Sequence, residues 1–136
     1  MTDVRTTEPS DERWEALAEA AWAVRDRAHV HGKTKVGAAV LSSEGGIFAG
    51  CNVEHRFRSH DVHAEVNALT TMVAAGHSEA LAVVIASQRD RFTPCGACLD
   101  WIFELGGPGC FVAFQHAPGA AFEALPADQL MPHYPR

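Results

Sequence analysis

Two short segments of the chain carry residue types that can bind and use a metal ion. His63 and Glu65 are two positions apart, and Cys95 and Cys98 form a C-x-x-C pair further along the chain. One imidazole and two thiolates suit tetrahedral zinc, and catalytic zinc sites have three protein ligands and leave the fourth position to water. Glu65 then remains as a general acid and base beside that water. These residue types are suited to a catalytic zinc site with His63, Cys95 and Cys98 as candidate ligands.

The chemistry expected of such a site is hydrolytic. Zinc lowers the pKa of a bound water towards neutrality and so supplies a nucleophile at physiological pH. Glu65 would take the proton of that water and pass it to the substrate and to the leaving group. On this mechanism, replacing Glu65 with alanine should preserve zinc binding and abolish turnover.

Other interpretations of these residues remain open at this point. A lone C-x-x-C also occurs as a redox pair or as half of a structural zinc site. A redox pair needs neither His nor Glu, and an all-cysteine site needs a second C-x-x-C, which the sequence lacks. His60 competes with His63 as the third ligand because both are close to Glu65 in sequence. Cys51 and Cys110 are expected to be buried structural thiols.

Length, composition and charge narrow the class of protein. A chain of 136 residues with 47% hydrophobic residues predicts one globular domain, residues 1–136, with residues 1–9 as a flexible N-terminal arm. The formal net charge of −6 argues against a nucleic-acid partner, but it is compatible with a neutral nucleoside. No leader-like or membrane-spanning apolar segment is evident, so no membrane partner is expected. Four cysteines without a leader indicate a cytoplasmic protein with free thiols.

Hydrophobic periodicity predicts alternating helices and strands. Strands that alternate with helices imply parallel crossovers and an α/β sheet with helices on its faces. Gly37 and Gly50 would let a helix or a ligand come close to the sheet. We expect helices at 11 to about 29, 64–75 and 95–105, strands at 35–41, 47–53, 81–87 and 110–114, a polar loop at 88–93, and a short strand and helix near the C-terminus.

Both metal-binding segments fall at predicted helix starts. His63 would precede one helix and Cys95 another. Helix N-termini present unpaired N–H groups and a partial positive charge, which favours the thiolate that binds metal. Cys95 and Cys98 are one helical turn apart, so both sulfurs could face one point. Two helix starts at the ends of neighbouring strands would then form a three-ligand site.

With these segments in place, the chain resembles the small, homotetrameric cytidine deaminases over about residues 14–134. H-x-E followed by P-C-x-x-C is the signature of zinc-dependent nucleobase deaminases, which favours His63 over His60. The similarity extends beyond the zinc motif. It includes VGAAVL at 36–41, GCNVE at 50–54, HAEVNAL at 63–69 and PCGACLDWIFEL at 94–105.

The resemblance implies a three-layer α/β/α fold with a mixed sheet of about five strands and helices on both faces. It implies zinc-dependent deamination of cytidine and deoxycytidine to uridine and deoxyuridine, by a homotetramer or dimer. The resemblance implies that His63, Cys95 and Cys98 bind zinc and that Glu65 shuttles protons and contacts the ring nitrogen N3. The backbone of Ala64 would bind the base oxygen O2. Asn52 and Glu54 would bind the ribose hydroxyls.

The chain also departs from the family pattern around the substrate. Thr34 and Lys35 occupy the stretch where the family usually has a phenylalanine against the base. Arg56 and Arg58 follow the N-x-E motif, and we expect them to be solvated or at a subunit interface. Their alternative role is contact with a charged substituent. This favours, as a second hypothesis, a deaminase of modified aminopyrimidine nucleosides like the blasticidin S deaminases. A non-catalytic zinc-stabilised module is a third, and a nucleic-acid editing deaminase would need a basic channel that this acidic chain lacks.

Overall fold

The elements of the fold follow the predicted order closely. A computed structural model describes residues 8–89 and 93–135. The helices are α1 (Asp11–Arg25), α2 (Ala64–Ala74), α3 (Gly96–Gly106) and α4 (Ala127–Leu130), with a 3-10 turn η1 (Arg58–His60). The strands are β1 (Val36–Ser42), β2 (Ile47–Cys51), β3 (Ala80–Ser87), β4 (Phe111–Gln115) and β5 (Ala124–Pro126).

The five strands form one mixed sheet in the order β2-β1-β3-β4-β5. β3 and β4 are parallel, whereas the β1–β2, β1–β3 and β4–β5 pairs are antiparallel. Because β2 and β3 are both antiparallel to β1, they run in the same direction. Two helical crossovers between like-directed strands result, through α2 and through α3. The predicted mixed five-stranded sheet is therefore confirmed.

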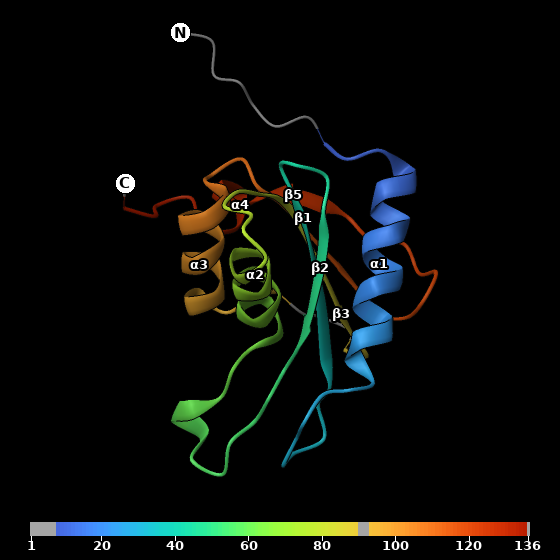
Figure 1. Ribbon diagram of the computed structural model, residues 1–136, viewed down its shortest axis with the longest axis vertical. Coiled ribbons are helices and arrows are strands. Elements are labelled where there is room, and N and C mark those ends of the chain that lie inside the picture. Colours follow the sequence, from blue (N-terminus) through green and yellow to red (C-terminus); the bar gives the residue numbers. More distant parts are fainter. Residues whose placement is uncertain (1–7, 90–92, 136) are drawn as a thin grey trace, which may run out of the picture.

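Helices cover both faces of this sheet. Figure 1 shows α1 on one side and α2 and α3 on the other. Alternate residues of β1 serve the two cores: Val40 packs in the cluster that contains Leu69 of α2 and Ile102 of α3, and Leu41 packs in the cluster that contains Leu17 of α1. The three-layer α/β/α arrangement expected from the family resemblance is confirmed.

Two glycines let the helices lie close to the sheet. A Cβ atom at Gly37 would lie 1.9 Å from the carbonyl oxygen of Ala21 in α1. A Cβ atom at Gly50 would lie 2.4 Å from the backbone nitrogen of Ala68 in α2. A real Cβ cannot approach other atoms so closely, so both positions require glycine. Of the two partners that the sequence allowed, a helix and a ligand, the structure has a helix in each case.

The chain departs from the predictions at a few boundaries. Helix α1 begins as expected, with Ser10 accepting a hydrogen bond from the Arg13 N–H at 3.3 Å, but it ends at Arg25 rather than near residue 29. The cause is tertiary pairing. His29 forms a β-bridge with Val53, which lies just after β2, so His29 cannot be part of the helix. The polar segment at 55–62, for which the sequence shows no helical or strand period, contains η1.

Some predictions concern residues outside the described ranges. Residues 1–7 of the expected N-terminal arm and residues 90–92 of the expected polar loop lie there. The longest helix in the described part of the chain is α1, with 15 residues. No described helix has both the length and the apolar character needed to cross a membrane.

Candidate active site

Two helix starts bring the expected metal ligands together. His63 is the N-cap residue of α2 and Cys95 is the N-cap residue of α3, both with extended backbone. Neither side chain caps its own helix, so each is available to a ligand. Cys98 lies in the first turn of α3 and is fully buried. The order of elements places both helix starts at the same end of the sheet.

The distances between the three side chains fit a zinc ion. The His63 Nδ1 atom lies 3.2 Å from the Cys98 Sγ atom and 3.4 Å from the Cys95 Sγ atom. The two sulfur atoms are 3.5 Å apart. In a tetrahedral site with Zn–S and Zn–N bonds of about 2.3 and 2.0 Å, the ligand atoms are about 3.5–3.8 Å apart. Only a slight expansion of this cluster would accommodate zinc.

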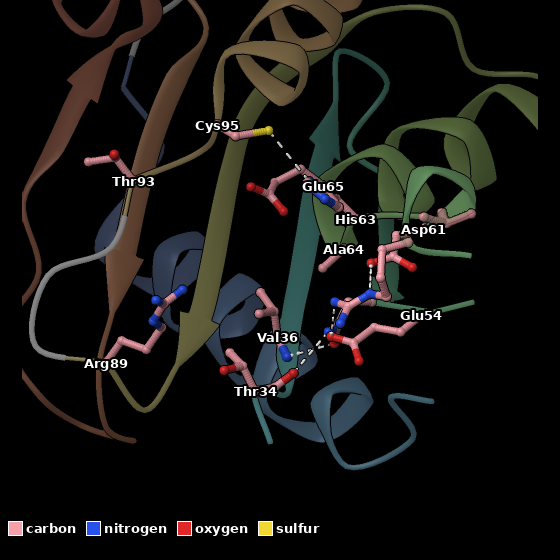
Figure 2. Close-up of a pocket in the computed structure, with 13 residues that line it drawn as sticks. Thr34, Val36, Glu54, Asp61, His63, Ala64, Glu65, Arg89, Thr93 and Cys95 are labelled. Carbon is pink, nitrogen blue, oxygen red and sulfur yellow. Dashed lines mark hydrogen bonds and ion pairs between the residues drawn. The ribbon is translucent and has the colours of Figure 1, made fainter. Parts of the chain in front are cut away.

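Glu65 is buried beside this cluster. It is the second residue of α2, and only 3% of its surface is exposed. Figure 2 shows its carboxylate near His63 and Cys95 at one end of a pocket. Burial raises the pKa of Glu65 above the ordinary value, although the nearby His63 and Cys98 side chains act in the opposite direction. A raised pKa suits a carboxyl group that must both accept and return a proton near neutral pH.

The buried position of Cys98 also affects the pKa of its thiol. Burial raises its pKa well above that of a free thiol, and the charge of Glu65 adds to the effect. Burial at this position thus opposes the thiolate form of Cys98. A bound metal ion reverses the balance, because the thiolate is the form that coordinates metal.

The pocket is a cleft of about 500 Å³, within the usual range for small-ligand sites. We call its two parts the metal end and the loop end. The metal end contains His63, Ala64, Glu65 and Cys95, with Cys98 buried behind them; the loop end contains Thr34, Asn52, Glu54, Arg58 and Asp61. The other lining residues are Val36, Val62, Arg89 and Thr93.

At the loop end, Asn52 joins two segments of backbone. Its Nδ2 donates to the Thr34 carbonyl oxygen at 2.9 Å, and its Oδ1 accepts from the Val36 N–H at 2.8 Å. These bonds fix the entry to β1 against the end of β2. Asn52 is thus partly satisfied by the protein, and one N–H and one lone pair of its amide remain for a ligand.

Glu54 is also held by backbone groups. Its Oε1 accepts hydrogen bonds from the His31 N–H at 2.8 Å and the Gly32 N–H at 2.9 Å. These bonds, that of Gly32 foremost, and the nearby Arg58 charge lower the pKa of Glu54, so it is ionised at neutral pH. Sequence reasoning expected a substrate hydroxyl to satisfy this buried carboxylate, but the protein already supplies most of its partners.

Arg58 and Asp61 are the main site residues that sequence reasoning missed. Arg58 was expected to be solvated or at a subunit interface. It is exposed, as expected of a solvated side chain, but it also lines the pocket, with Nη2 2.9 Å from the Glu54 Oε2 and Nε 2.8 Å from the Asp61 Oδ2. The i,i+4 and i,i+3 spacings of these three charges were the available signal. Arg56 is exposed and does not line the pocket.

His60, the competing ligand candidate, lies outside the metal cluster. Its Nδ1 atom is 3.1 Å from the Ser59 hydroxyl, and its ring lies 4.9 Å from that of His55 in the exposed loop. Within the described residues, the side chains that converge as possible metal ligands are those of His63, Cys95 and Cys98. Cys51 and Cys110 are buried, as expected for structural thiols.

Comparison with known proteins agrees with this geometry. The protein-family model for the cytidine and deoxycytidylate deaminase zinc-binding region matches residues 11–114 of this chain. A probable cytidine deaminase of Dictyostelium discoideum is 38% identical over 100 residues, which cover 71% of this chain and 68% of that protein. A cytidine deaminase of Sporosarcina psychrophila is 41% identical over 83 residues, 59% of this chain and 60% of that protein.

Solved structures show the same fold. The crystal structure of cytidine deaminase from Burkholderia pseudomallei superposes with a TM-score of 0.81 at 31% identity, covering 92% of this chain and 98% of that one. The crystal structure of cytidine deaminase from Mycobacterium leprae superposes with a TM-score of 0.77 at 27% identity, covering 88% of this chain and 98% of that one. From the length of the match to the family model and the agreement of the folds, the chain belongs to the cytidine and deoxycytidylate deaminase family of zinc-binding proteins.

Proposed function

We propose that this protein deaminates cytidine and deoxycytidine hydrolytically, giving uridine and deoxyuridine and releasing ammonia. The observation that carries the proposal is the buried Glu65 carboxylate beside three convergent metal ligands in a nucleoside-sized pocket. In the reaction, an oxygen from water becomes bonded to C4 of the base and the bond from C4 to the exocyclic nitrogen breaks.

The roles at the metal end follow from the chain's own side chains. His63, Cys95 and Cys98 hold zinc, and bound zinc supplies a Lewis acid that lowers the pKa of water to near neutrality. Glu65 accepts one proton of the attacking water and gives it to the ring nitrogen N3. It then takes the second proton from the hydroxyl added at C4 and gives it to the amino group, which leaves as ammonia while C4 becomes a carbonyl. The burial of Glu65 keeps bulk water from competing for that proton.

The substrate-binding roles extend from the metal end to the loop end. The Ala64 N–H lies at the start of α2, where backbone donors are unpaired, and it donates to the base oxygen O2. Asn52 and Glu54 bind the ribose hydroxyls with the hydrogen-bonding capacity that remains to them. The nucleoside thus lies along the pocket, with its base near Glu65 and its sugar near Glu54.

A modified aminopyrimidine nucleoside is the second candidate substrate. Thr34 lines the pocket where the family resemblance would place an aromatic side chain, and the Arg58 and Arg89 side chains also line it. The smaller side chain at position 34 leaves room for a bulkier substituent. This candidate shares the zinc chemistry and differs only in the group attached to the nucleoside.

We further propose a homotetramer located in the cytoplasm, formed from single-domain chains. Exposed apolar side chains at Phe57, Val73 and Trp101 give subunit contacts a basis, and four free thiols suit a reducing compartment. Light scattering should give about four times the 14.7 kDa mass of one chain. A monomeric mass would overturn the assembly, and recovery in a membrane or secreted fraction would overturn the location.

The deciding experiment is a spectrophotometric assay of the zinc-loaded protein with cytidine. The wild type should form uridine, and Glu65→Ala should lose at least about 100-fold in kcat with its zinc content unchanged. Glu19→Ala, an exposed glutamate of α1 on the other side of the sheet, is the matched control and should behave as wild type. No turnover of cytidine but turnover of a cytosine-containing antibiotic would favour the second candidate. No turnover of any aminopyrimidine, with unfolding on chelation, would indicate a structural zinc module.

A further inference from the structure

The loop end contains a cluster of three charged residues, Glu54, Arg58 and Asp61, that contact one another. Arg58 lies between two carboxylates, 2.9 Å from Glu54 and 2.8 Å from Asp61. Asp61 also accepts a hydrogen bond from the His55 N–H at 2.7 Å, which closes the loop on itself. Both carboxylate side chains are about 90% buried, whereas 57% of the Arg58 side chain is exposed. Arg58 therefore reaches from the pocket mouth to a buried acceptor.

The hydrogen-bonding capacity of this pair is incomplete. Oε1 of Glu54 accepts two backbone hydrogen bonds, and among the described residues Oε2 meets only Arg58, which leaves a lone pair on Oε2. Arg58 has five N–H donors, of which these contacts use two, and no third partner for it occurs within the part of the chain that the structure describes. A free donor and a free acceptor thus lie side by side at the pocket wall.

The chemistry of such a pair selects a hydroxyl group. An alcohol both donates and accepts, so one hydroxyl can donate to the Glu54 Oε2 and accept from the Arg58 guanidinium. The pair favours a neutral ligand over an anion, because Glu54, Arg58 and Asp61 together carry one net negative charge. A carboxylate or phosphate on the substrate would meet this charge unfavourably.

We propose that Arg58 is a specificity-determining residue that, with Glu54, recognises one hydroxyl of the nucleoside sugar through a donor–acceptor pair. The inference rests on the proposed function, because it takes the ligand to be a nucleoside with its base at the metal end. Asp61 is the positioning residue that holds the guanidinium in place. The exposed Arg58 would otherwise have no fixed direction.

The test combines variants of Arg58 with substrates that lack single hydroxyls. Arg58→Gln should lower kcat/KM for cytidine by about tenfold, mainly through KM, because a charge-assisted hydrogen bond to substrate is lost. The two analogues are 3′-deoxycytidine and 2′-deoxycytidine. For one of them, kcat/KM should be nearly the same in Arg58→Gln and in the wild type, because the hydroxyl it lacks is the partner of Arg58. Arg58→Lys should recover part of the loss, since it restores a charged donor.

The controls separate recognition from general damage. Arg56→Gln removes an arginine of the same loop that does not line the pocket, and it should keep wild-type kinetics with all three substrates. Equal losses by Arg58→Gln on cytidine and on both analogues would overturn the inference, as would no loss on cytidine. An inactive wild type would overturn the proposed function and the inference with it, so the two failures are distinguishable.

Discussion

The metal end and the loop end of the pocket are built in different ways. At the metal end, His63 and Cys95 are N-cap residues of two packed helices, and their ligand atoms converge within 3.5 Å of that of Cys98. At the loop end, Glu54 and Arg58 come from an irregular segment after an edge strand and are held by ion pairs and backbone bonds. Helix starts thus position the proposed metal ligands, and hydrogen bonds and ion pairs within an irregular segment position the groups proposed to contact the sugar.

Removing a ligand at the metal end should have the largest effect. Cys98→Ala deletes one of the three proposed zinc ligands, and His63 and Cys95 alone should not form a stable site. Zinc content after dialysis should fall close to zero, and deamination of cytidine should fall to background. Atomic emission and the spectrophotometric assay measure the two effects.

A matched variant tests whether this effect belongs to the metal rather than to the core. Cys110→Ala also deletes a fully buried thiol, which packs in the same core cluster as the residues of α2 and α3. It should keep its zinc and its activity, with only the modest loss of stability that a small cavity causes. Full zinc occupancy in Cys98→Ala would show that the three convergent side chains are not the metal site.

The metal end could be predicted from the sequence because its geometry is local. Two residues separate Cys95 from Cys98 and one separates His63 from Glu65, and each pair begins a helix whose apolar periodicity is clear. A helical turn places Cys98 on the same side as Cys95, and the single residue between His63 and Glu65 keeps both at the start of α2. The predicted order of strands and helices also indicated that the starts of the two helices, and with them the two pairs of residues, lie close together.

The loop end could not be predicted in the same way. The segment after β2 is polar and aperiodic, so no period indicated that Arg58 faces the pocket while Arg56 does not. The early end of α1 was missed for a related reason, because His29 pairs with the segment around Val53, far away in sequence. Tertiary pairing thus overrides local preference at the end of α1, whereas the loop end lacked a periodic pattern.

A substitution that affects both ends should have an intermediate effect. Gly50 of β2 lies against the backbone of Ala68 and the Asn67 side chain in α2, and a Cβ there would come within 2.7 Å of both. Gly50→Ala should therefore lower the free energy of unfolding by about 1–3 kcal/mol, because α2 must move away from the sheet. The shift also displaces the start of α2, so kcat should fall together with stability.

Gly96→Ala is the matched control for Gly50→Ala. Gly96 is also in a regular element, the first residue of α3, but nothing lies within 4 Å of a Cβ atom built there. Alanine is tolerated well in a helix, so thermal unfolding should be unchanged or slightly improved. Equal stability of Gly50→Ala and wild type would show that the sheet and α2 are not in close contact at this point.

The smallest expected effect is on stability in acid, and it belongs to the loop end alone. The backbone N–H groups of Gly32 and His31, with Arg58, lower the pKa of Glu54 in the folded protein. A lowered pKa means that the unfolded chain binds more protons, so this carboxylate stabilises the fold fully above its unfolded pKa of ~4 and loses that contribution as the pH falls through the lower folded-state pKa. Glu54→Gln should therefore weaken the fall in stability below about pH 5, relative to Glu19→Gln. Urea unfolding of both zinc-loaded variants from pH 7 down to pH 3.5 measures the difference, and acid release of zinc affects both alike. Parallel pH profiles would mean that Glu54 is no more firmly held in the folded state than an exposed carboxylate, and the loop end would then be as mobile as its sequence suggests.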